Sequence, residues 1–334
     1  ELQVFFNACP YGLETIELPR LLDTKRRNRP VPLKVSYPDC EEGRKLPLVI
    51  VSHGGGGNWN ASSYQVQHIV SHGYIVVSIE HVYSNTSSWR HYMSHRGGSK
   101  GLIGSLRYMT KDPRAVLERP RDVSFAIDSA LEWNEKHSDL RARINESKIA
   151  VMGHSFGAYT TLVACGAKPR IDNLRPENRL HWPSLDELSE SRIDIGIAMS
   201  HQGPHSVFFD ESSYESIHSP LLCFTGSRDR ERSADGSTFS ALTRIEGFEL
   251  FPRGDKYLLW LENANHMGFS YNSRSRWGKY NRARPDTQRI TKVMILVFLQ
   301  AYLKGDERAR KALCPEFAKS LCGEYVDGID WYQR

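Results

Sequence analysis

The chain has 334 residues, of which 40% are hydrophobic and 25% charged, and its formal net charge at pH 7 is +5. These proportions are typical of a soluble globular protein and exclude a disordered or collagen-like chain. No apolar run reaches the ~20 residues that a transmembrane helix requires, so we expect no transmembrane segment. The small charge and the lack of a nucleic-acid-binding motif argue against a nucleic-acid partner.

The number of cysteines and the first residue of the chain bear on the cellular compartment in which the protein resides. Six cysteines are too few for a disulfide scaffold, but Cys314 and Cys322 lie eight residues apart in the tail, and we expect them to form a disulfide. Cys9 and Cys40 lie outside the predicted core, and whether they pair stays open. The chain begins at Glu1 and shows no signal peptide, as expected of a mature or trimmed chain. These features favour a secreted or periplasmic protein; they predict no oligomeric state.

Strands and helices alternate along the chain. Each predicted strand is nearly continuous in hydrophobicity, which favours an α/β fold with a mostly parallel central sheet and helices on both faces. Ligand sites on such sheets lie at the carboxyl ends of the strands. In chain order, the patterns predict strands within 15–19, 32–38, 46–57, 73–81, 148–153, 192–200, 219–229 and 256–266, and helices over 119–137, 156–167 and 286–305.

No linker, internal repeat or low-complexity stretch divides the chain. We therefore predict a single domain over residues 1–334. Its core spans about 14–305, and residues 306–334 form a C-terminal tail.

A long connection, residues 82–118, precedes the helix at 119–137. Its length far exceeds the ~2–6 residues usual for such a loop, and long loops of this kind are commonly lids or binding elements. We expect this insertion to lie near the active site, with its aromatic side chains, Trp89 among them, lining the substrate pocket. The region from Arg90 to Arg121 also carries eight Lys or Arg against two acidic residues. These cations either face solvent or select an anionic substrate.

The segment VMGHSFGAYTTLV, residues 151–163, places Ser155 in a G-x-S-x-G motif. By itself this short pattern occurs by chance in many chains. A nucleophile elbow also requires a strand before the serine, a sharp turn that Gly153 and Gly157 permit, and a helix after it. The flanking apolar and helix-compatible runs meet these requirements, so we predict that Ser155 is a nucleophile.

Three further features complete the predicted site. The run HGGGGN, residues 53–58, follows a strand and exposes backbone N–H groups suited to bind an oxyanion, with the N–H of Phe156 as a second donor. Asp229 and His266 each follow a later strand, and the order Ser155, Asp229, His266 is that of the α/β-hydrolase fold. This position favours Asp229 as the acid over three other candidates, Asp194, Asp235 and Asp255. The pairs HQGPH and HYMSH lack a third ligand, so we predict no metal site.

Several sequence blocks resemble one branch of the α/β-hydrolases, which contains platelet-activating-factor acetylhydrolases, dienelactone-hydrolase-like proteins and polyester-degrading cutinase relatives. The blocks are SHGGGG, SHGYIVVSIEH, RPRDVSFAIDSAL, GHSFGAYT, QGP, TGSRD and NANHMGF, and the resemblance covers roughly residues 14–305. It implies that Ser155, Asp229 and His266 form a catalytic triad.

The same resemblance implies that Gly55 and Phe156 supply the oxyanion amides. A fourth glycine in this loop leaves open whether Gly55 or Gly56 donates. His201 and Gln202 are expected near the site, because family members carry a similar loop there. The candidate pocket residues are Gly56, Trp59, Trp89, His201 and Gln202.

We therefore expect a serine carboxylester hydrolase that acts through an acyl-enzyme, without a cofactor, on hydrophobic or bulky esters, either small or polymeric. Ser155 stands where true dienelactone hydrolases have cysteine, so lactone specificity is not carried over. Hydrolysis of amide or peptide bonds on the same scaffold is the main alternative. A non-catalytic binding protein is disfavoured because no triad member is missing.

Overall fold

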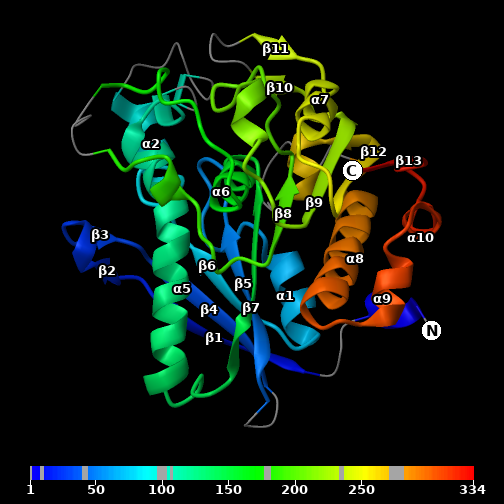
Figure 1. The fold of residues 1–334 in the computed structure, drawn as a ribbon, viewed down its shortest axis with the longest axis horizontal. Coiled ribbons are helices and arrows are strands. Elements are labelled where there is room, and N and C mark those ends of the chain that lie inside the picture. Colours follow the sequence, from blue (N-terminus) through cyan, green and yellow to red (C-terminus); the bar gives the residue numbers. More distant parts are fainter. Residues whose placement is uncertain are drawn as a thin grey trace.

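The computed structural model describes residues 2–7, 11–39, 44–95, 104–105, 108–176, 182–232, 237–270 and 282–334. Helices cover both faces of a large, mostly parallel sheet, so the predicted fold class is confirmed (Figure 1). Cys9, Cys40 and Asp235 lie outside the described ranges, as do three of the eight cations between Arg90 and Arg121, namely Arg96, Lys100 and Arg107.

The central sheet contains nine strands of the described chain. They are β1 (Gly12–Leu18), β4 (Leu33–Asp39), β5 (Leu46–Ser52), β6 (Ile75–Ile79), β7 (Ile144–His154), β8 (Ile195–Met199), β9 (Leu221–Arg228), β12 (Lys256–Asn265) and β13 (Ile329–Gln333). Their spatial order is β1-β4-β6-β5-β7-β8-β9-β12-β13. The strands from β6 to β12 run parallel, whereas β1 and β4 at one edge and β13 at the other pair antiparallel. Two short pairs lie apart, β2 (Leu22–Asp23) with β3 (Arg29–Pro30) and β10 (Glu231–Arg232) with β11 (Thr238–Phe239).

The strands are apolar throughout because both sheet faces are covered. In β5, Leu48 and Ile50 pack on one face, and Val49 and Val51 pack on the other. Neighbouring residues of a strand point to opposite faces, so a continuous apolar run needs a layer of helices on each side. The first face is covered by α5 (Glu118–Lys136) and α6 (Phe156–Ala164), and the second by α1 (Ser63–Ser71) and α8 (Arg284–Leu303) (Figure 1).

The described residues form five further helices. They are α2 (Thr86–His95), α4 (Pro113–Val116), α7 (Thr243–Glu249), α9 (Glu307–Ala312) and α10 (Pro315–Ser320), together with the 3₁₀ turns η1 (Leu2–Phe5), η2 (Thr24–Arg26), η4 (Asp186–Leu188), η5 (Glu211–Tyr214) and η6 (His266–Phe269). Within the described ranges, no helix combines the length and the apolar character needed to cross a membrane.

The sequence analysis missed α1 because this helix buries polar side chains. Gln65 donates to the carbonyl of Phe269 at 3.2 Å, and the Nε2 of His68 lies 3.0 Å from the carbonyl oxygen of Phe5. Both side chains are buried. An apolar periodicity interrupted by such residues does not predict a helix, although the Gln65 amide nitrogen and the His68 ring each have a hydrogen-bond partner.

The expected disulfide between Cys314 and Cys322 is wrong, because both thiols are free. Cys314 caps the start of α10, and Cys322 follows its last turn. A helix rises about 12 Å over eight residues, whereas bridged cysteines have Cα atoms about 4.4–6.8 Å apart. The tail is held instead by buried Phe317 and Val326 and by pairing of β13 with β12. The disulfide therefore no longer supports a secreted or periplasmic location.

Candidate active site

A strained turn at Ser155 joins β7 to α6. Ser155 has φ +58° and ψ −116°, a backbone conformation that residues with a side chain rarely adopt. Its N–H donates to the carbonyl of Met199 at 2.9 Å. Its own carbonyl accepts from the backbone N–H of Tyr159 at 3.1 Å and from the side-chain amide of Gln202 at 2.8 Å. These hydrogen bonds hold the turn in a conformation that lifts the serine side chain above the sheet.

Glycine is required on both sides of this serine. A Cβ added at Gly153 would lie 2.3 Å from the carbonyl oxygen of Gly157. A Cβ added at Gly157 would lie 2.0 Å from the carbonyl oxygen of Ser52. Because both distances are far below van der Waals contact with backbone atoms, a larger residue would force the elbow away from β5. This confirms the reason given from the sequence for both glycines.

Ser155, His266 and Asp229 form a continuous series of hydrogen bonds. The Oγ of Ser155 lies 2.9 Å from Nε2 of His266, and Nδ1 of His266 lies 2.8 Å from Oδ1 of Asp229. His266 follows β12, and Asp229 follows β9, the parallel neighbour of β12 in the sheet. Ser155 and His266 are half-buried, whereas Asp229 is fully buried. The hydroxyl and the imidazole are therefore accessible, with the carboxylate behind them.

The Asp229 carboxylate is held by further donors. Thr225 donates its hydroxyl to Oδ2 at 3.0 Å, and the guanidinium of Arg244 donates to Oδ1 at 3.0 Å. Burial alone would raise the pKa of this carboxyl, but the positive charge of Arg244 and the interaction with His266 hold that pKa well below its usual range. Asp229 is therefore ionised at neutral pH and accepts the hydrogen bond from Nδ1–H of His266.

The glycine loop after β5 lies against this elbow. A Cβ added at Gly54 would lie 3.5 Å from the Cβ of Ser155. The N–H of Gly56 donates to the carbonyl of Ser84 at 2.8 Å. Among the described residues the N–H of Gly55 has no such backbone acceptor. These contacts favour Gly55 over Gly56 as an oxyanion donor.

Phe156 is the first residue of α6. The N–H groups of a first helical turn have no acceptor within the helix, and the helix dipole places partial positive charge there. Its amide is thus suited to stabilise negative charge next to Ser155. The aromatic side chain is buried and stacks on Phe208, with ring centroids 5.1 Å apart.

The pocket residues expected from the sequence separate into two groups. Trp89 lies against the glycine loop, because a Cβ added at Gly56 would be 3.3 Å from the Cγ of Trp89. Trp59 is half-buried a few residues further along the same loop. Gly56 has a φ of +74°, which a residue with a side chain would adopt only with strain.

His201 and Gln202 are buried residues that bind backbone carbonyls at the site. His201 is fully buried, and its Nε2 lies 2.8 Å from the carbonyl oxygen of Arg244. Gln202 is also buried and binds the backbone of Ser155, as described above. His201 therefore contacts the site region through the Arg244 backbone, and its assignment as a pocket residue stays a prediction.

The sequence pattern does not mark several residues that contact the site directly. Thr225 and Arg244 bind Asp229. His154 places its Nε2 2.8 Å from the carbonyl oxygen of His266, with the two rings 4.8 Å apart. Burial first, and the neighbouring charge of His266 second, lower the pKa of His154 to about 3. A neutral His154 therefore donates Nε2–H to that carbonyl. Its position directly before Ser155 was the only signal available.

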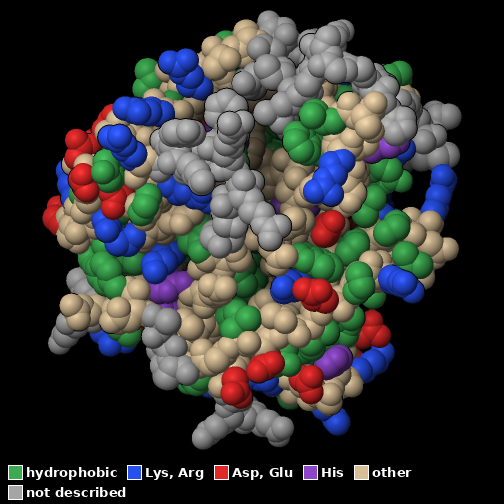
Figure 2. Space-filling view, turned by 180° about the vertical axis from the view of Figure 1, so that it is seen from behind, with side chains coloured by type: hydrophobic (Ala, Val, Ile, Leu, Met, Phe, Trp, Pro, Cys, Tyr) green, Lys and Arg blue, Asp and Glu red, His purple; other side chains and the backbone are tan. Residues whose placement is uncertain are grey.

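Several of the described cations between Arg90 and Arg121 have structural partners. Arg114 forms an ion pair with Asp112 at 2.8 Å and stacks over Tyr83 at 4.4 Å. Arg121 pairs with Glu118 at 3.0 Å. On the face shown in Figure 2, basic and acidic side chains of the described residues are interspersed. These contacts favour the solvated and structural interpretation of the cations over substrate selection.

Comparisons with known proteins agree with this architecture. A family model described as "Platelet-activating factor acetylhydrolase, isoform II" matches residues 26–101 and 117–173. A platelet-activating factor acetylhydrolase of Canis lupus familiaris is 28% identical over 246 residues, which cover 64% of this chain and 53% of the relative. The corresponding protein of Cavia porcellus is 26% identical over 151 residues, 40% of this chain and 34% of the relative. Cutinase 2 of Thermobifida cellulosilytica is 29% identical over 118 residues, 34% of this chain and 44% of the relative.

The sheet and the turn at Ser155 have the architecture of the α/β-hydrolase fold. Over part of its length the chain is similar to platelet-activating factor acetylhydrolases and to cutinases. The chain spans about a third to a half of the length of the curated relatives that it matches.

Proposed function

We propose that this protein is a serine carboxylester hydrolase with Ser155 as nucleophile, His266 as general base and Asp229 as the acid of the triad. The observation that carries the proposal is the unbroken series of hydrogen bonds from Ser155 Oγ through His266 to Asp229. A serine hydroxyl is a weak nucleophile unless an adjacent base takes its proton, and this series supplies that base in the required orientation.

The mechanism follows from these positions. As Oγ of Ser155 attacks the ester carbonyl, its proton moves to Nε2 of His266, and Asp229 stabilises the resulting imidazolium through Nδ1–H. The N–H groups of Gly55 and Phe156 stabilise the negative oxygen of the tetrahedral intermediate. Collapse of this intermediate transfers the proton from His266 to the leaving alcohol and forms the acyl-enzyme. His266 then activates a water molecule that releases the acid and restores Ser155.

We infer that the substrates are hydrophobic or bulky esters. The matched relatives are named for acetyl-ester hydrolysis of platelet-activating factor and for cutinase activity, so ester rather than amide hydrolysis is favoured. The indole of Trp89 beside the glycine loop supports an apolar wall close to the scissile bond.

A panel of substrates tests this proposal. p-Nitrophenyl acetate, butyrate and octanoate are compared with an acetyl phospholipid, a polyester film and the matching p-nitroanilides, for the wild type and for Ser155→Ala. We expect hydrolysis of the esters and a loss of at least ~10⁴-fold in kcat for Ser155→Ala. A folded Ser155→Ala variant with more than a tenth of the wild-type activity would refute the nucleophile. Faster hydrolysis of anilides than of esters would refute the substrate class.

A further inference from the structure

Arg119 is a fully buried arginine at the start of α5, and no carboxylate contacts its guanidinium among the described residues. Burial lowers the pKa of Arg119 to about 9, and the more distant charge of Asp122 opposes that shift. Burying a charge without a contacting counter-ion is costly. The hydrogen bonds of the Arg119 guanidinium must therefore offset this cost.

The hydrogen-bond acceptors of Arg119 lie on the two segments that lead into or carry the proposed oxyanion donors, or, at Ser84, on a residue that binds one of these segments. Its Nη2 donates to the carbonyl of His53, directly before the glycine loop, and to the hydroxyl of Ser52 at 3.1 Å. Its Nη1 donates to the hydroxyl of Ser84 at 2.6 Å, and the carbonyl of Ser84 accepts the N–H of Gly56. The Arg119 guanidinium therefore binds both the residues directly before the glycine loop and Ser84, whose carbonyl holds Gly56 within that loop.

The same guanidinium also contacts α6. Its Nε donates to the hydroxyl of Thr160 at 2.9 Å, and that hydroxyl donates to the carbonyl of Phe156 at 2.9 Å. The guanidinium carbon lies 4.3 Å from the centroid of the Phe156 ring. Gly55 lies in the loop held by Arg119, and Phe156 is the other proposed donor, so both oxyanion amides belong to segments that this side chain joins.

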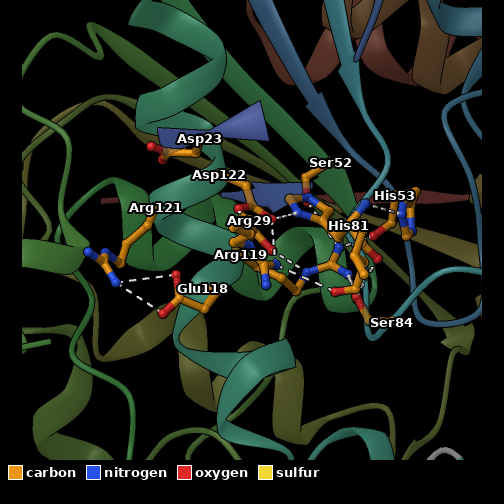
Figure 3. A network of polar contacts seen from close by, with 12 residues as sticks. Asp23, Arg29, Ser52, His53, His81, Ser84, Glu118, Arg119, Arg121 and Asp122 are labelled. Atoms are coloured by element: carbon orange, nitrogen blue, oxygen red, sulfur yellow. Dashed lines mark hydrogen bonds and ion pairs between the residues drawn. The ribbon is translucent and has the colours of Figure 1, made fainter. Parts of the chain in front are cut away.

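A second layer of buried groups holds Arg119 in place (Figure 3). Asp122 accepts from Arg29 at 2.8 Å and from Nδ1 of His81 at 2.9 Å. The Nε2 of His81 then lies 2.9 Å from the Ser52 hydroxyl, which accepts from Arg119. This hydrogen-bond chain connects the carboxylate of α5 to the end of β5, and it orients the acceptors of Arg119.

We propose that Arg119 is a positioning residue of the oxyanion hole, which it keeps in register by joining the glycine loop to the start of α6. The inference rests on the proposed esterase function. Preorganised donors stabilise a transition state only if they are already aimed at the developing charge. Loss of Arg119 is therefore expected to weaken binding of the tetrahedral state much more than binding of the ground-state ester.

The test compares Arg119→Met, Arg119→Lys and Ser84→Ala with the wild type. The matched control is Arg143→Lys, since Arg143 is also a buried arginine but donates to the carbonyls of Asp139 and Pro38, outside the Arg119 network. For each variant, kcat and KM for p-nitrophenyl acetate are measured together with the Ki of a trifluoromethyl ketone. Addition of Ser155 Oγ to that ketone gives a hemiketal oxyanion and moves the serine proton to His266. Circular dichroism melting gives the folded fraction.

Per folded molecule, we expect Arg119→Met to lower kcat about 10- to 100-fold, with KM within about threefold of the wild type. The ketone Ki is expected to rise by the same factor as kcat/KM falls. Arg119→Lys recovers part of the loss, Ser84→Ala shows a smaller loss of the same kind, and Arg143→Lys shows none.

Two results would overturn the inference while leaving the esterase function intact: a folded Arg119→Met with unchanged kcat, or a lower kcat with an unchanged ketone Ki. If Arg119→Met does not fold, a Ser84→Ala variant with unchanged kcat and Ki has the same force. A wild type without Ser155-dependent ester hydrolysis would instead overturn the proposed function, and the inference with it.

Discussion

Arg244 donates to Oδ1 of Asp229 at 3.0 Å, the same carboxylate oxygen that lies 2.8 Å from Nδ1 of His266. A second bond, from Nε of Arg244 to the Asp229 carbonyl at 2.9 Å, fixes the orientation of the arginine. Arg244 therefore keeps Asp229 ionised and places its oxygen toward the imidazole. The charge and orientation of Asp229, the acid of the proposed triad, therefore depend on Arg244, which lies 15 positions further along the chain.

Replacement of Asp229 by Asn removes the charge and keeps the shape. An asparagine amide that donates toward His266 favours the wrong imidazole tautomer, so we expect kcat to fall about 10⁴-fold with a modest change in KM. Steady-state kinetics with p-nitrophenyl acetate measure the loss. Asp194→Asn is the control, since Asp194 accepts the N–H of Ile149 at 2.7 Å, away from His266. Equal losses in the two variants would contradict the assignment of Asp229.

Trp89→Ala tests the expected pocket wall. Because the indole lies against Gly56 of the glycine loop, its loss is expected to remove apolar contact with a long acyl chain. We expect kcat/KM for p-nitrophenyl octanoate to fall about tenfold, and that for the acetate to change little. Trp133→Ala, near the C-terminal end of α5, is expected to affect neither substrate. A Trp89→Ala variant with the same loss on both esters would argue against a wall for bulky substrates.

Buried histidines make the stability of this protein sensitive to acid. Burial first, and the charge of Arg244 second, lower the pKa of His201 from 6.5 to about 4. Between these values the unfolded chain binds a proton that the folded protein does not, so the free energy of unfolding decreases as pH falls below 6.5. This one histidine is expected to account for about 1.4 kcal/mol of the stability lost between pH 7.5 and 5.5.

The variant that tests this is His201→Gln, whose amide nitrogen is able to replace the Nε2–H donor to the Arg244 carbonyl. Urea unfolding at pH 7.5 and 5.5 is expected to show a difference in stability about 1.4 kcal/mol smaller than in the wild type. Replacement of exposed His205 by Gln serves as the comparison. An unchanged difference in His201→Gln would mean that His201 is protonated in the folded protein.

The sequence predicted the parts of the site that depend on local pattern. The nucleophile elbow was predictable because Ser155 stands between two glycines, and a strand and a helix flank them. His266 and Asp229 were predictable because each follows an apolar run that reads as a strand. The structure brings the three side chains together, and their catalytic roles stay with the proposal. The single-domain organisation and the pocket residues also stay predictions.

Residues that act through distant contacts were not predictable. Arg119 bonds Thr160, 41 positions away, and Ser52, 67 positions away, and nothing in the flanking sequence marks these partners. The disulfide prediction in the C-terminal tail failed for a different reason. The short spacing of Cys314 and Cys322 indicated a bridge, but helix α10 lies between the two cysteines and keeps them apart.

Covalent labelling of Ser155 tests the central claim most directly. The wild-type protein is treated with one equivalent of a fluorophosphonate, its remaining p-nitrophenyl acetate hydrolysis is recorded, and the adduct is located by intact-mass measurement and peptide mapping. We expect one adduct per chain, on Ser155, formed in proportion to the activity lost, and no adduct in Ser155→Ala or in unfolded protein. Ester hydrolysis that persists after complete labelling of Ser155, or inactivation with the adduct on another residue, would contradict the account.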